Sequence, residues 1–205
     1  MSQAPLIFMV DDQAGVLKAL GRLLNAAGFS SQAYTSAQTF LDSGNAAAPG
    51  CLILDLAMPE MDGFALQKAL VARSSDLPII FLSGHAGIRD GVQAMKAGAA
   101  DFLTKPVDED ALINAVQQAL ERNQIARNIR LERDNVVARL ASLTAREREV
   151  MDLIIEGKLN KQIADTLVLA EKTVKIHRAR VMNKMQVRSV AVLVSLLNNL
   201  KDTPA

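Results

Sequence analysis

Five short apolar runs in the first half of the chain constrain its fold more than any other feature. Most of them are unbroken rather than alternating, which is the pattern of β-strands that are covered on both faces. Segments with apolar residues at helical spacing follow them, so strand and helix alternate five times. This alternation predicts an α/β fold, a doubly wound parallel sheet of five strands with helices on both faces. The runs are Leu6–Val10, Ser30–Tyr34, Cys51–Leu54, Leu77–Leu82 and Ala100–Leu103.

Polar side chains follow four of these runs, at the points where the strands are expected to end. Asp11 and Asp12 follow the first run, Asp55 the third, Ser83 the fourth and Lys105 the fifth. In a doubly wound sheet the carboxyl ends of the strands form the ligand-binding edge, so these groups are expected to meet there. Each close pair of carboxylates would repel by about 4 kcal/mol at an effective dielectric of about 20. Because whole proteins are stable by only about 5–15 kcal/mol, the cluster requires a cation.

A hard divalent ion with oxygen ligands fits this cluster, and Mg²⁺ is the first choice because it works with carboxylates, water and phosphates. Asp55 is then placed as the nucleophile that accepts a phosphoryl group, giving an aspartyl phosphate. Asp12, supported by Asp11, is expected to hold the metal. Lys105 and Ser83 are expected to bind two other phosphoryl oxygens. Taken singly, each residue also has an ordinary structural reading, such as a helix cap for Asp11 or a surface position for Lys105.

Two other uses of such a sheet conflict with the sequence. An FMN site of the flavodoxin type needs a phosphate loop rich in Ser, Thr and Gly after the first strand, whereas two acids stand there. A phosphatase of the haloacid dehalogenase type needs an Asp-x-Asp motif after its first strand, whereas Asp11 and Asp12 are contiguous. Neither alternative fits this chain.

Residues 6–120 resemble a response-regulator receiver domain, whose fold is flavodoxin-like. The resemblance implies that a sensor histidine kinase phosphorylates Asp55. It also implies that Asp12, Asp55 and the carbonyl of Ala57 bind Mg²⁺. The motifs that carry it are Asp11-Asp12, Asp55 followed by Met58-Pro59-Glu60-Met61-Asp62-Gly63, Ser83-Gly84-His85 and Lys105-Pro106.

The same resemblance implies a switch. Ser83 and Phe102 are expected to move together on phosphorylation, rearranging the face built from the fourth helix, the fifth strand and the fifth helix. In the family this face dimerises. The Lys105–Pro106 bond is expected to be cis, a state of low cost only before proline. Gln13 stands where many relatives carry a third acid, a change expected to alter the phosphoryl lifetime and to leave the metal pair intact.

The rear of the chain has the charge of a nucleic-acid-binding domain. Residues 143–205 carry 11 Lys and Arg against 7 Asp and Glu, whereas residues 1–120 carry 7 against 12. Such a split suggests a DNA-binding C-terminal part. Thr144 and Glu147 form a capping box that starts the first of four short expected helices.

Residues 160–185 have helix-turn-helix proportions, with Asn160 as the expected cap of the first helix and a basic second helix. On the second helix Lys175 and Arg178 are expected to face outward, able to enter a DNA major groove. Taken alone, this basic run also fits a solvated charged face. Its motifs, however, resemble the LuxR-type domain: Leu143-Thr144-x-Arg146-Glu147-x-Glu149-Val150, Asn160-Lys161-x-Ile163-Ala164, Lys172-Thr173-Val174-Lys175-x-His177-Arg178 and Val181-Met182-x-Lys184-Met185.

The LuxR-type resemblance divides the expected DNA contacts into two kinds. Lys175 and Ile176 are expected to meet base edges, which specify sequence. Ala170 stands where relatives often place a Ser that caps the recognition helix, and loss of such a cap costs about 1 kcal/mol. The whole chain most resembles the FixJ subgroup of the NarL-type regulators. The residues expected nearer the phosphates are Lys172, Thr173, His177 and Lys184.

The expected domains are a receiver at 1–120, a helical linker at 121–142 and a DNA-binding domain at 143–205. Helical spacing continues through the linker without Gly or Pro until Gly157. Ile125 and Ile129 begin a heptad-like seam, but two of its five positions are charged. A plain helical spacer is therefore favoured over a coiled coil.

These features predict a phosphorylation-dependent transcriptional regulator and not an enzyme, since the receiver is expected to catalyse only its own phosphorylation and dephosphorylation. Expected partners are a sensor histidine kinase, double-stranded promoter DNA, RNA polymerase and, once phosphorylated, a second copy of the chain. The alternative is a DNA-binding or protein-interaction module with a vestigial receiver, against which the intact acidic set argues. The single cysteine, Cys51, and the lack of a signal peptide or an apolar run of membrane-spanning length indicate a cytoplasmic protein.

Overall fold

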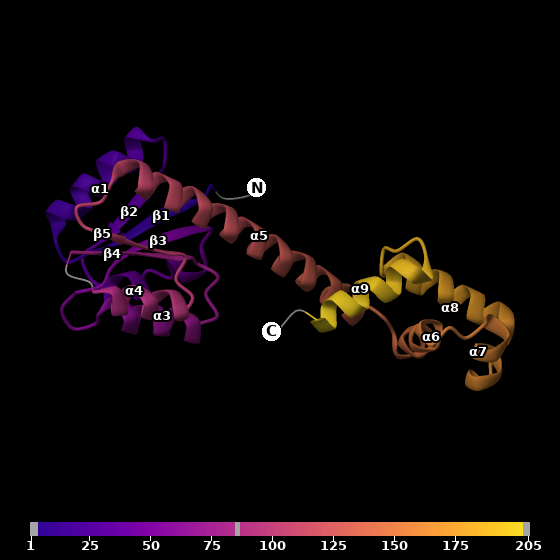
Figure 1. The fold of residues 1–205 in the computed structure, drawn as a ribbon. Helices are drawn as coiled ribbons and strands as arrows, with labels where there is room; N and C mark the ends of the chain where they lie inside the picture. The colour runs from indigo at the N-terminus through magenta and orange to yellow at the C-terminus, as the bar shows by residue number, and fades with distance from the viewer. Residues whose placement is uncertain (1–3, 85–86, 203–205) are drawn as a thin grey trace. The chain divides into compact units, whose positions relative to one another are not determined.

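The computed structural model describes residues 4–84 and 87–202 (Figure 1). The chain divides into two compact units between Asn128 and Ile129. The first is an α/β unit and the second is all-helical. His85, part of the Ser83-Gly84-His85 motif, lies outside the described residues.

The first unit contains the predicted parallel sheet. Its five strands lie in the order β2-β1-β3-β4-β5, and every neighbouring pair is parallel. This order confirms the doubly wound, flavodoxin-like fold, and each strand begins and ends within two residues of the apolar run that predicted it. The strands are β1 (Leu6–Val10), β2 (Ser31–Tyr34), β3 (Gly50–Asp55), β4 (Ile79–Ser83) and β5 (Asp101–Thr104).

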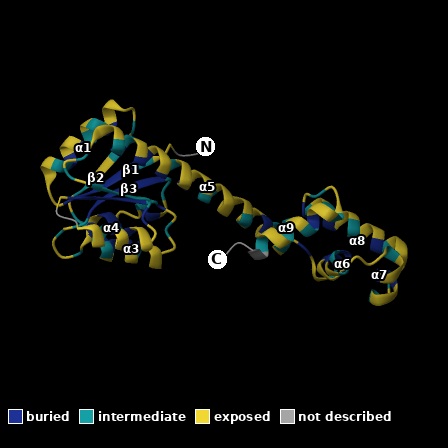
Figure 2. Cartoon of the chain, viewed as in Figure 1, coloured by how far each residue is buried: buried dark blue, intermediate teal, exposed yellow. Residues whose placement is uncertain are grey.

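Helices cover both faces of the sheet, which is why the central strands read as unbroken apolar runs. One face packs against α1 and the first part of α5, and the other packs against α2, α3 and α4. Figure 2 shows the result as a buried sheet between helices whose outer faces are exposed. All six residues of β3 are buried. The helical elements are α1 (Ala14–Ala26), α2 (Ala37–Asp42), a short 3₁₀ turn η1 (Asn45–Ala47), α3 (Gly63–Ala72), α4 (Ile88–Lys96) and α5 (Glu109–Ala141).

Helix α5 continues through all but the last residue of the expected linker, 121–142. Asn123 on this helix is only 3% exposed. Its side-chain carbonyl accepts from the backbone N–H of Gly50 at 3.0 Å, and its amide nitrogen donates to the carbonyl of Asp76 at 2.8 Å. Arg127 donates to the carbonyl of Ala47 at 2.8 Å. These bonds attach α5 to the amino ends of β3 and β4 as far as Arg127.

The second unit is a small helical bundle around one core. Among the described residues, six of its side chains are fully buried, namely Val150, Ile163, Val174, Val181, Met185 and Leu193. The expected spacing of Val174, Val181 and Met185 toward the bundle is therefore confirmed. Besides the end of α5, the unit comprises α6 (Ala145–Ile155), α7 (Asn160–Leu167), α8 (Glu171–Lys184) and α9 (Val190–Asp202).

The caps of this unit agree with the sequence in part. Thr144 and Glu147 form the predicted capping box at the start of α6. The expectation that Asn160 caps α7 is wrong, because Leu159 occupies the cap position and its N–H donates to the side chain of Gln162 at 2.9 Å. Asn160 instead accepts a hydrogen bond from Arg178 at 3.3 Å.

None of the helices formed by the described residues is both long enough and apolar enough to cross a bilayer.

Candidate functional site: a carboxylate cluster and a basic helix

The predicted carboxylates meet at the carboxyl edge of the sheet. Asp11 directly follows β1 and Asp55 ends β3, and their side chains are only 3% and 5% exposed. The ammonium of Lys105, just after β5, lies between them. Its Nζ is 2.7 Å from Asp11 Oδ2 and 2.8 Å from Asp55 Oδ1. Neighbouring parallel strands thus place two buried acids around one lysine.

At this edge of the sheet, the carboxylates of Asp11, Asp12 and Asp55 outnumber the single ammonium of Lys105. Burial raises the pKa of the Asp55 carboxyl. The hydrogen bond and charge of Lys105 only partly oppose this rise, and the negative charges of Asp11 and Asp12 add to it. Burial alone would lower the pKa of Lys105, but the hydrogen bonds to Asp11 and Asp55 outweigh burial and hold it above its usual value. One lysine therefore does not balance this set of acids.

A third acid completes a possible metal site. Asp12 is exposed, and one carboxylate oxygen from each of Asp11, Asp12 and Asp55 lies within 4.8 Å of the others. Carboxylate oxygens are the donors that Mg²⁺ takes in proteins, and Mg²⁺ keeps several waters, which an exposed acid leaves room for. Ala57, whose carbonyl is the fourth predicted ligand, lies in the exposed loop two residues after Asp55. The donor set fits a hard divalent cation.

The loop after Asp55 is held close to the site by a glycine. A β-carbon on Gly63 would lie 2.6 Å from the carbonyl oxygen of Asp55 and 2.9 Å from the ring of Phe81. The N–H of Gly63 donates to the carbonyl of Leu56 at 3.0 Å, and Asp62 caps α3. The motif therefore ends in Asp-Gly because the first turn of α3 packs directly on the strand end that carries Asp55.

The expected switch residues lie beside this cluster. Ser83 ends β4 and is 3% exposed, and its carbonyl accepts from the Lys105 N–H at 2.8 Å. Phe102 on β5 is half-buried, with its ring centroid 6.2 Å from that of Phe81. The Lys105–Pro106 bond is cis, as expected.

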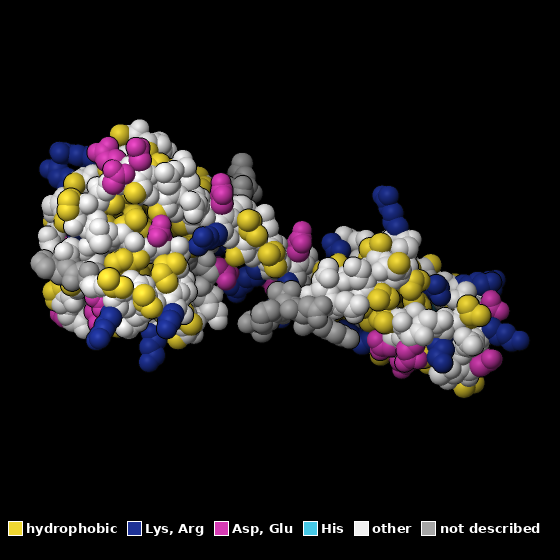
Figure 3. Space-filling view, viewed as in Figure 1, with side chains coloured by type: hydrophobic (Ala, Val, Ile, Leu, Met, Phe, Trp, Pro, Cys, Tyr) yellow, Lys and Arg dark blue, Asp and Glu magenta, His cyan; other side chains and the backbone are white. Residues whose placement is uncertain are grey.

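Helix α4, which forms part of the expected dimerisation face, carries an unusual surface. Ile88, Val92 and Met95 are 89%, 48% and 49% exposed. Arg89 and Lys96 flank a shallow pocket on this helix. In Figure 3, hydrophobic side chains gather over the region of α4, and Lys and Arg side chains stand out along the lower edge of the unit below them.

The residues predicted to contact DNA occupy one helix, α8, of the second unit. Lys172, Lys175 and Ile176 are exposed, and Lys175 forms an ion pair with Glu171 one turn away, at 3.3 Å. In Figure 3, Lys and Arg side chains stand out from the surface near α7 and α8. The helix begins without a side-chain cap at Ala170, as the sequence predicted.

Four other residues predicted to contact DNA are partly buried or bonded within the protein. Thr173 and Arg178 are half-buried, and Arg178 donates to Asn160. His177 is also half-buried, with its Nδ1 inside the domain. Lys184 at the end of α8 donates to the carboxylate of Glu147 at 2.6 Å. No sequence signal separates Lys184 from the exposed lysines, because its partner lies 37 residues away.

Comparison with known families and proteins assigns both units. Residues 7–117 match the family model of the response regulator receiver domain. Residues 141–197 match the family model of bacterial regulatory proteins of the luxR family.

Relatives and solved structures share this two-part organisation over almost the whole chain. The response regulator protein TodT of Pseudomonas putida is 41% identical over 201 residues, which is 98% of this chain and 88% of that protein. The transcriptional regulatory protein FixJ of Bradyrhizobium diazoefficiens is 38% identical over 190 residues, 93% of each. The solved structure of the response regulator StyR is 45% identical and aligns with a TM-score of 0.88, covering 95% of this chain and 98% of that one.

Proposed function

The chain belongs to the response regulators that join a receiver domain to a LuxR-type DNA-binding domain, and we propose that phosphorylation of Asp55 controls its binding to promoter DNA. The observation that carries the proposal is the set of three acids around one lysine at the carboxyl edge of the sheet. A receiver domain implies a histidine kinase as its partner, and a transcriptional regulator of this kind acts on DNA in the cytoplasm.

Each residue at the sheet edge has a role in the phosphoryl transfer. An oxygen of Asp55 forms the new bond to phosphorus, and the bond from phosphorus to the kinase histidine breaks. Lys105, which now lies between Asp11 and Asp55, binds an oxygen of the incoming group, and the Ser83 hydroxyl donates to another. Asp12, Asp55 and the carbonyl of Ala57, with Asp11 in support, would hold Mg²⁺, which neutralises charge on a transferring phosphoryl group. The receiver catalyses no reaction other than its own phosphorylation and dephosphorylation.

The switch then acts through the side chains next to the site. Ser83 and Phe102 move together when Asp55 is phosphorylated. This rearranges the surface of α4, where Ile88 and Val92 are exposed. A second phosphorylated copy covers that surface, and the dimer presents two recognition helices to two half-sites.

The DNA contacts come from the exposed side of α8. Lys175 and Ile176 read base edges, and Arg178 lies on the outer side of the helix, able to enter the major groove. Lys172, Thr173 and His177 lie nearer the phosphates. RNA polymerase is the expected downstream partner of the bound dimer.

The test combines a phosphorylation assay with sedimentation velocity. We expect acetyl phosphate to phosphorylate the purified protein only with Mg²⁺, and Asp55→Asn to incorporate no phosphoryl group. Asp42→Asn is the matched control, since Asp42 is exposed at the end of α2. We expect beryllofluoride, which mimics the aspartyl phosphate, to convert monomer to dimer in the wild type and not in Asp55→Asn. Full phosphorylation of Asp55→Asn would contradict the site, and failure of the wild type to bind beryllofluoride would favour a vestigial receiver.

A further inference from the structure

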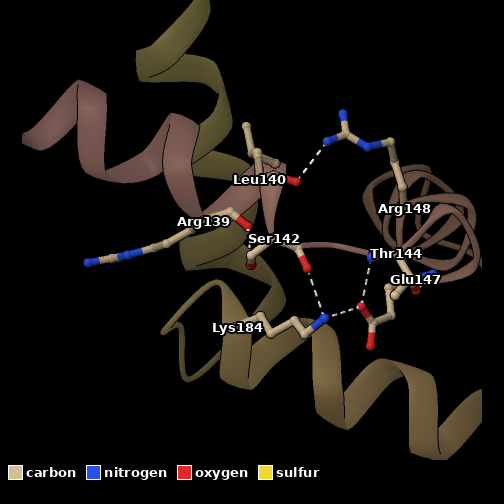
Figure 4. Close-up of polar contacts among 7 residues, drawn as sticks. All are labelled: Arg139, Leu140, Ser142, Thr144, Glu147, Arg148 and Lys184. Atoms are coloured by element: carbon tan, nitrogen blue, oxygen red, sulfur yellow. Dashed lines mark hydrogen bonds and ion pairs between the residues drawn. The ribbon is translucent and has the colours of Figure 1, made fainter.

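A polar network joins three helices of the second unit at the end of the recognition helix (Figure 4). The ammonium of Lys184, the last residue of α8, donates to Glu147 Oε2 at 2.6 Å and to the backbone carbonyl of Ser142 at 2.9 Å. Glu147 Oε2 also accepts the N–H of Thr144 at 2.9 Å. The Glu147 side chain is only 4% exposed, so this is an internal ion pair.

Two arginines extend the network in both directions. Arg148 on α6 donates to the carbonyl of Leu140, in the last turn of α5, at 2.7 Å. Arg139 on α5 donates to the carbonyl of Met185, directly after α8, at 3.4 Å. The end of α5 and the end of α8 are therefore each held by a basic side chain from the other helix.

This arrangement satisfies groups that a helix cannot satisfy by itself. The last carbonyls of an α-helix have no intrahelical partner and lie at the negative end of its dipole. Cations that approach them from other helices both pair these carbonyls and fix the neighbouring helix in place. Here Lys184 and Arg148 meet the end of α5, and Arg139 meets the end of α8.

The same contacts leave Lys184 poorly suited to bind a phosphate. Two of the three donors of its ammonium are already in use. Its charge is paired with the buried Glu147, whereas Lys172 on the same helix is exposed. A lysine that is neutralised within the protein releases few counterions when DNA binds.

We propose that Lys184 is a positioning residue, which seats the recognition helix α8 against the last turn of α5 and the start of α6, and that it contacts no DNA phosphate itself. This inference rests on the proposed DNA-contacting face of α8. Lys175 and Lys184 are nine residues apart, about 13 Å along the helix, so a tilt of about 10° at Lys184 moves Lys175 by about 2 Å. Site geometry tolerates displacements of only about 0.5 Å. Sequence discrimination therefore depends on how this end of α8 is seated.

The experiment compares two lysines of one helix in the full-length protein. Lys184→Met is tested against Lys172→Met for binding to two duplexes, one selected from a random pool with the wild type and one of scrambled sequence. Affinity is measured over a range of salt concentrations. For Lys172→Met we expect weaker binding to both duplexes and a salt slope smaller by about one. For Lys184→Met we expect the wild-type slope, with about a tenfold loss on the selected duplex, similar to one mismatched base pair, and little change on the scrambled one.

A salt slope reduced by about one in Lys184→Met would overturn the positioning role. An unchanged ratio of affinities for the two duplexes in a folded Lys184→Met protein would also overturn it, since a purely structural ion pair changes stability alone. If Lys184→Met fails to fold, Arg139→Met, which removes the reciprocal bond to Met185, tests whether the seating of this end of α8 sets the ratio of affinities for the two duplexes. An unchanged ratio in Arg139→Met would then overturn the positioning role. An unchanged salt slope in Lys172→Met would contradict the proposed DNA-contacting face of α8. The comparison of Lys184→Met with the wild type would still decide the role of Lys184.

Discussion

Each unit of this protein contains a buried acid paired with a lysine, in nearly the same geometry and with opposite electrostatics. In the receiver, Lys105 lies 2.8 Å from Asp55, and in the C-terminal unit Lys184 lies 2.6 Å from Glu147. The acids are 5% and 4% exposed. Yet the pKa of Asp55 is raised, whereas hydrogen bonds from Lys184 and Thr144 lower the pKa of Glu147 to about 2.

The difference lies in what surrounds each pair. Glu147 has one lysine and one backbone N–H to itself, so its ionised form is fully compensated. Asp55 shares its lysine with Asp11 and lies near the negative charge of Asp12, so the charge of its ionised form is not fully compensated. A balanced ion pair stabilises a fold, whereas an unbalanced one is ready to bind a cation and a phosphoryl group. The number of charges around a buried acid–lysine pair, and not the distance between its two groups, therefore distinguishes a stabilising pair from a ligand-binding one.

The largest expected effect concerns the balanced pair. Glu147→Gln should destabilise the C-terminal unit by about 2 kcal/mol, because Lys184 loses the charge that compensates it. The measurement is thermal unfolding followed by far-ultraviolet circular dichroism. Glu149→Gln, two residues along α6, is the control. Its pair with Arg146 is half-exposed, so its loss should cost less than about 0.5 kcal/mol. Equal effects of the two substitutions would remove the basis of the comparison.

Lowering the pH should gradually remove the contribution of ionised Glu147 to the stability of the C-terminal unit. The folded-state pKa of Glu147, about 2, lies below its ordinary value of 4.5. Its stabilising contribution is therefore present above about pH 4.5 and is lost as the pH falls through that value toward 2. Acid titration of the stability of the C-terminal unit should show this loss in the wild type and a flatter profile in Glu147→Gln. Parallel acid profiles would contradict the low pKa.

Magnesium should act on the other unit only. At ten times its Kd, Mg²⁺ should stabilise the receiver by about 1.4 kcal/mol and leave the C-terminal unit unchanged. Tyr34, on β2, is the one tyrosine of a chain without tryptophan, so its fluorescence in denaturant reports on the receiver. Asp12→Asn should weaken the effect. Stabilisation of both units to the same extent would point to a nonspecific salt effect.

The smallest expected effect has the opposite sign to the first. Without Mg²⁺, Asp55→Asn should stabilise the receiver by about 1 kcal/mol, because it removes one charge from an overcrowded set and leaves Lys105 paired with Asp11. Denaturant unfolding followed by Tyr34 fluorescence again measures the stability of the receiver. A loss of stability in Asp55→Asn would mean that Asp55, like Glu147, is already balanced.

The sequence predicted the receiver more completely than the C-terminal unit, for a physical reason. In a parallel sheet, position along a strand alone brings Asp11, Asp55 and Lys105 to one edge. On a helix, sequence spacing gives the face of a residue but not its partner. From the sequence alone, Lys184 therefore cannot be distinguished from the exposed Lys172. Asn123 likewise has the sequence context of a solvated linker residue, although it is only 3% exposed.

The attachment of α5 also determines where regulators of this kind can be recombined. The helix is bound to the receiver through Asn123 and Arg127, and to the C-terminal core from Val136 onward. A chimera that exchanges DNA-binding domains should therefore be joined between Arg127 and Val136. A junction at residue 120, where the expected receiver domain ends, would separate the receiver from Asn123, whose amide bonds to the backbone of Gly50 and Asp76.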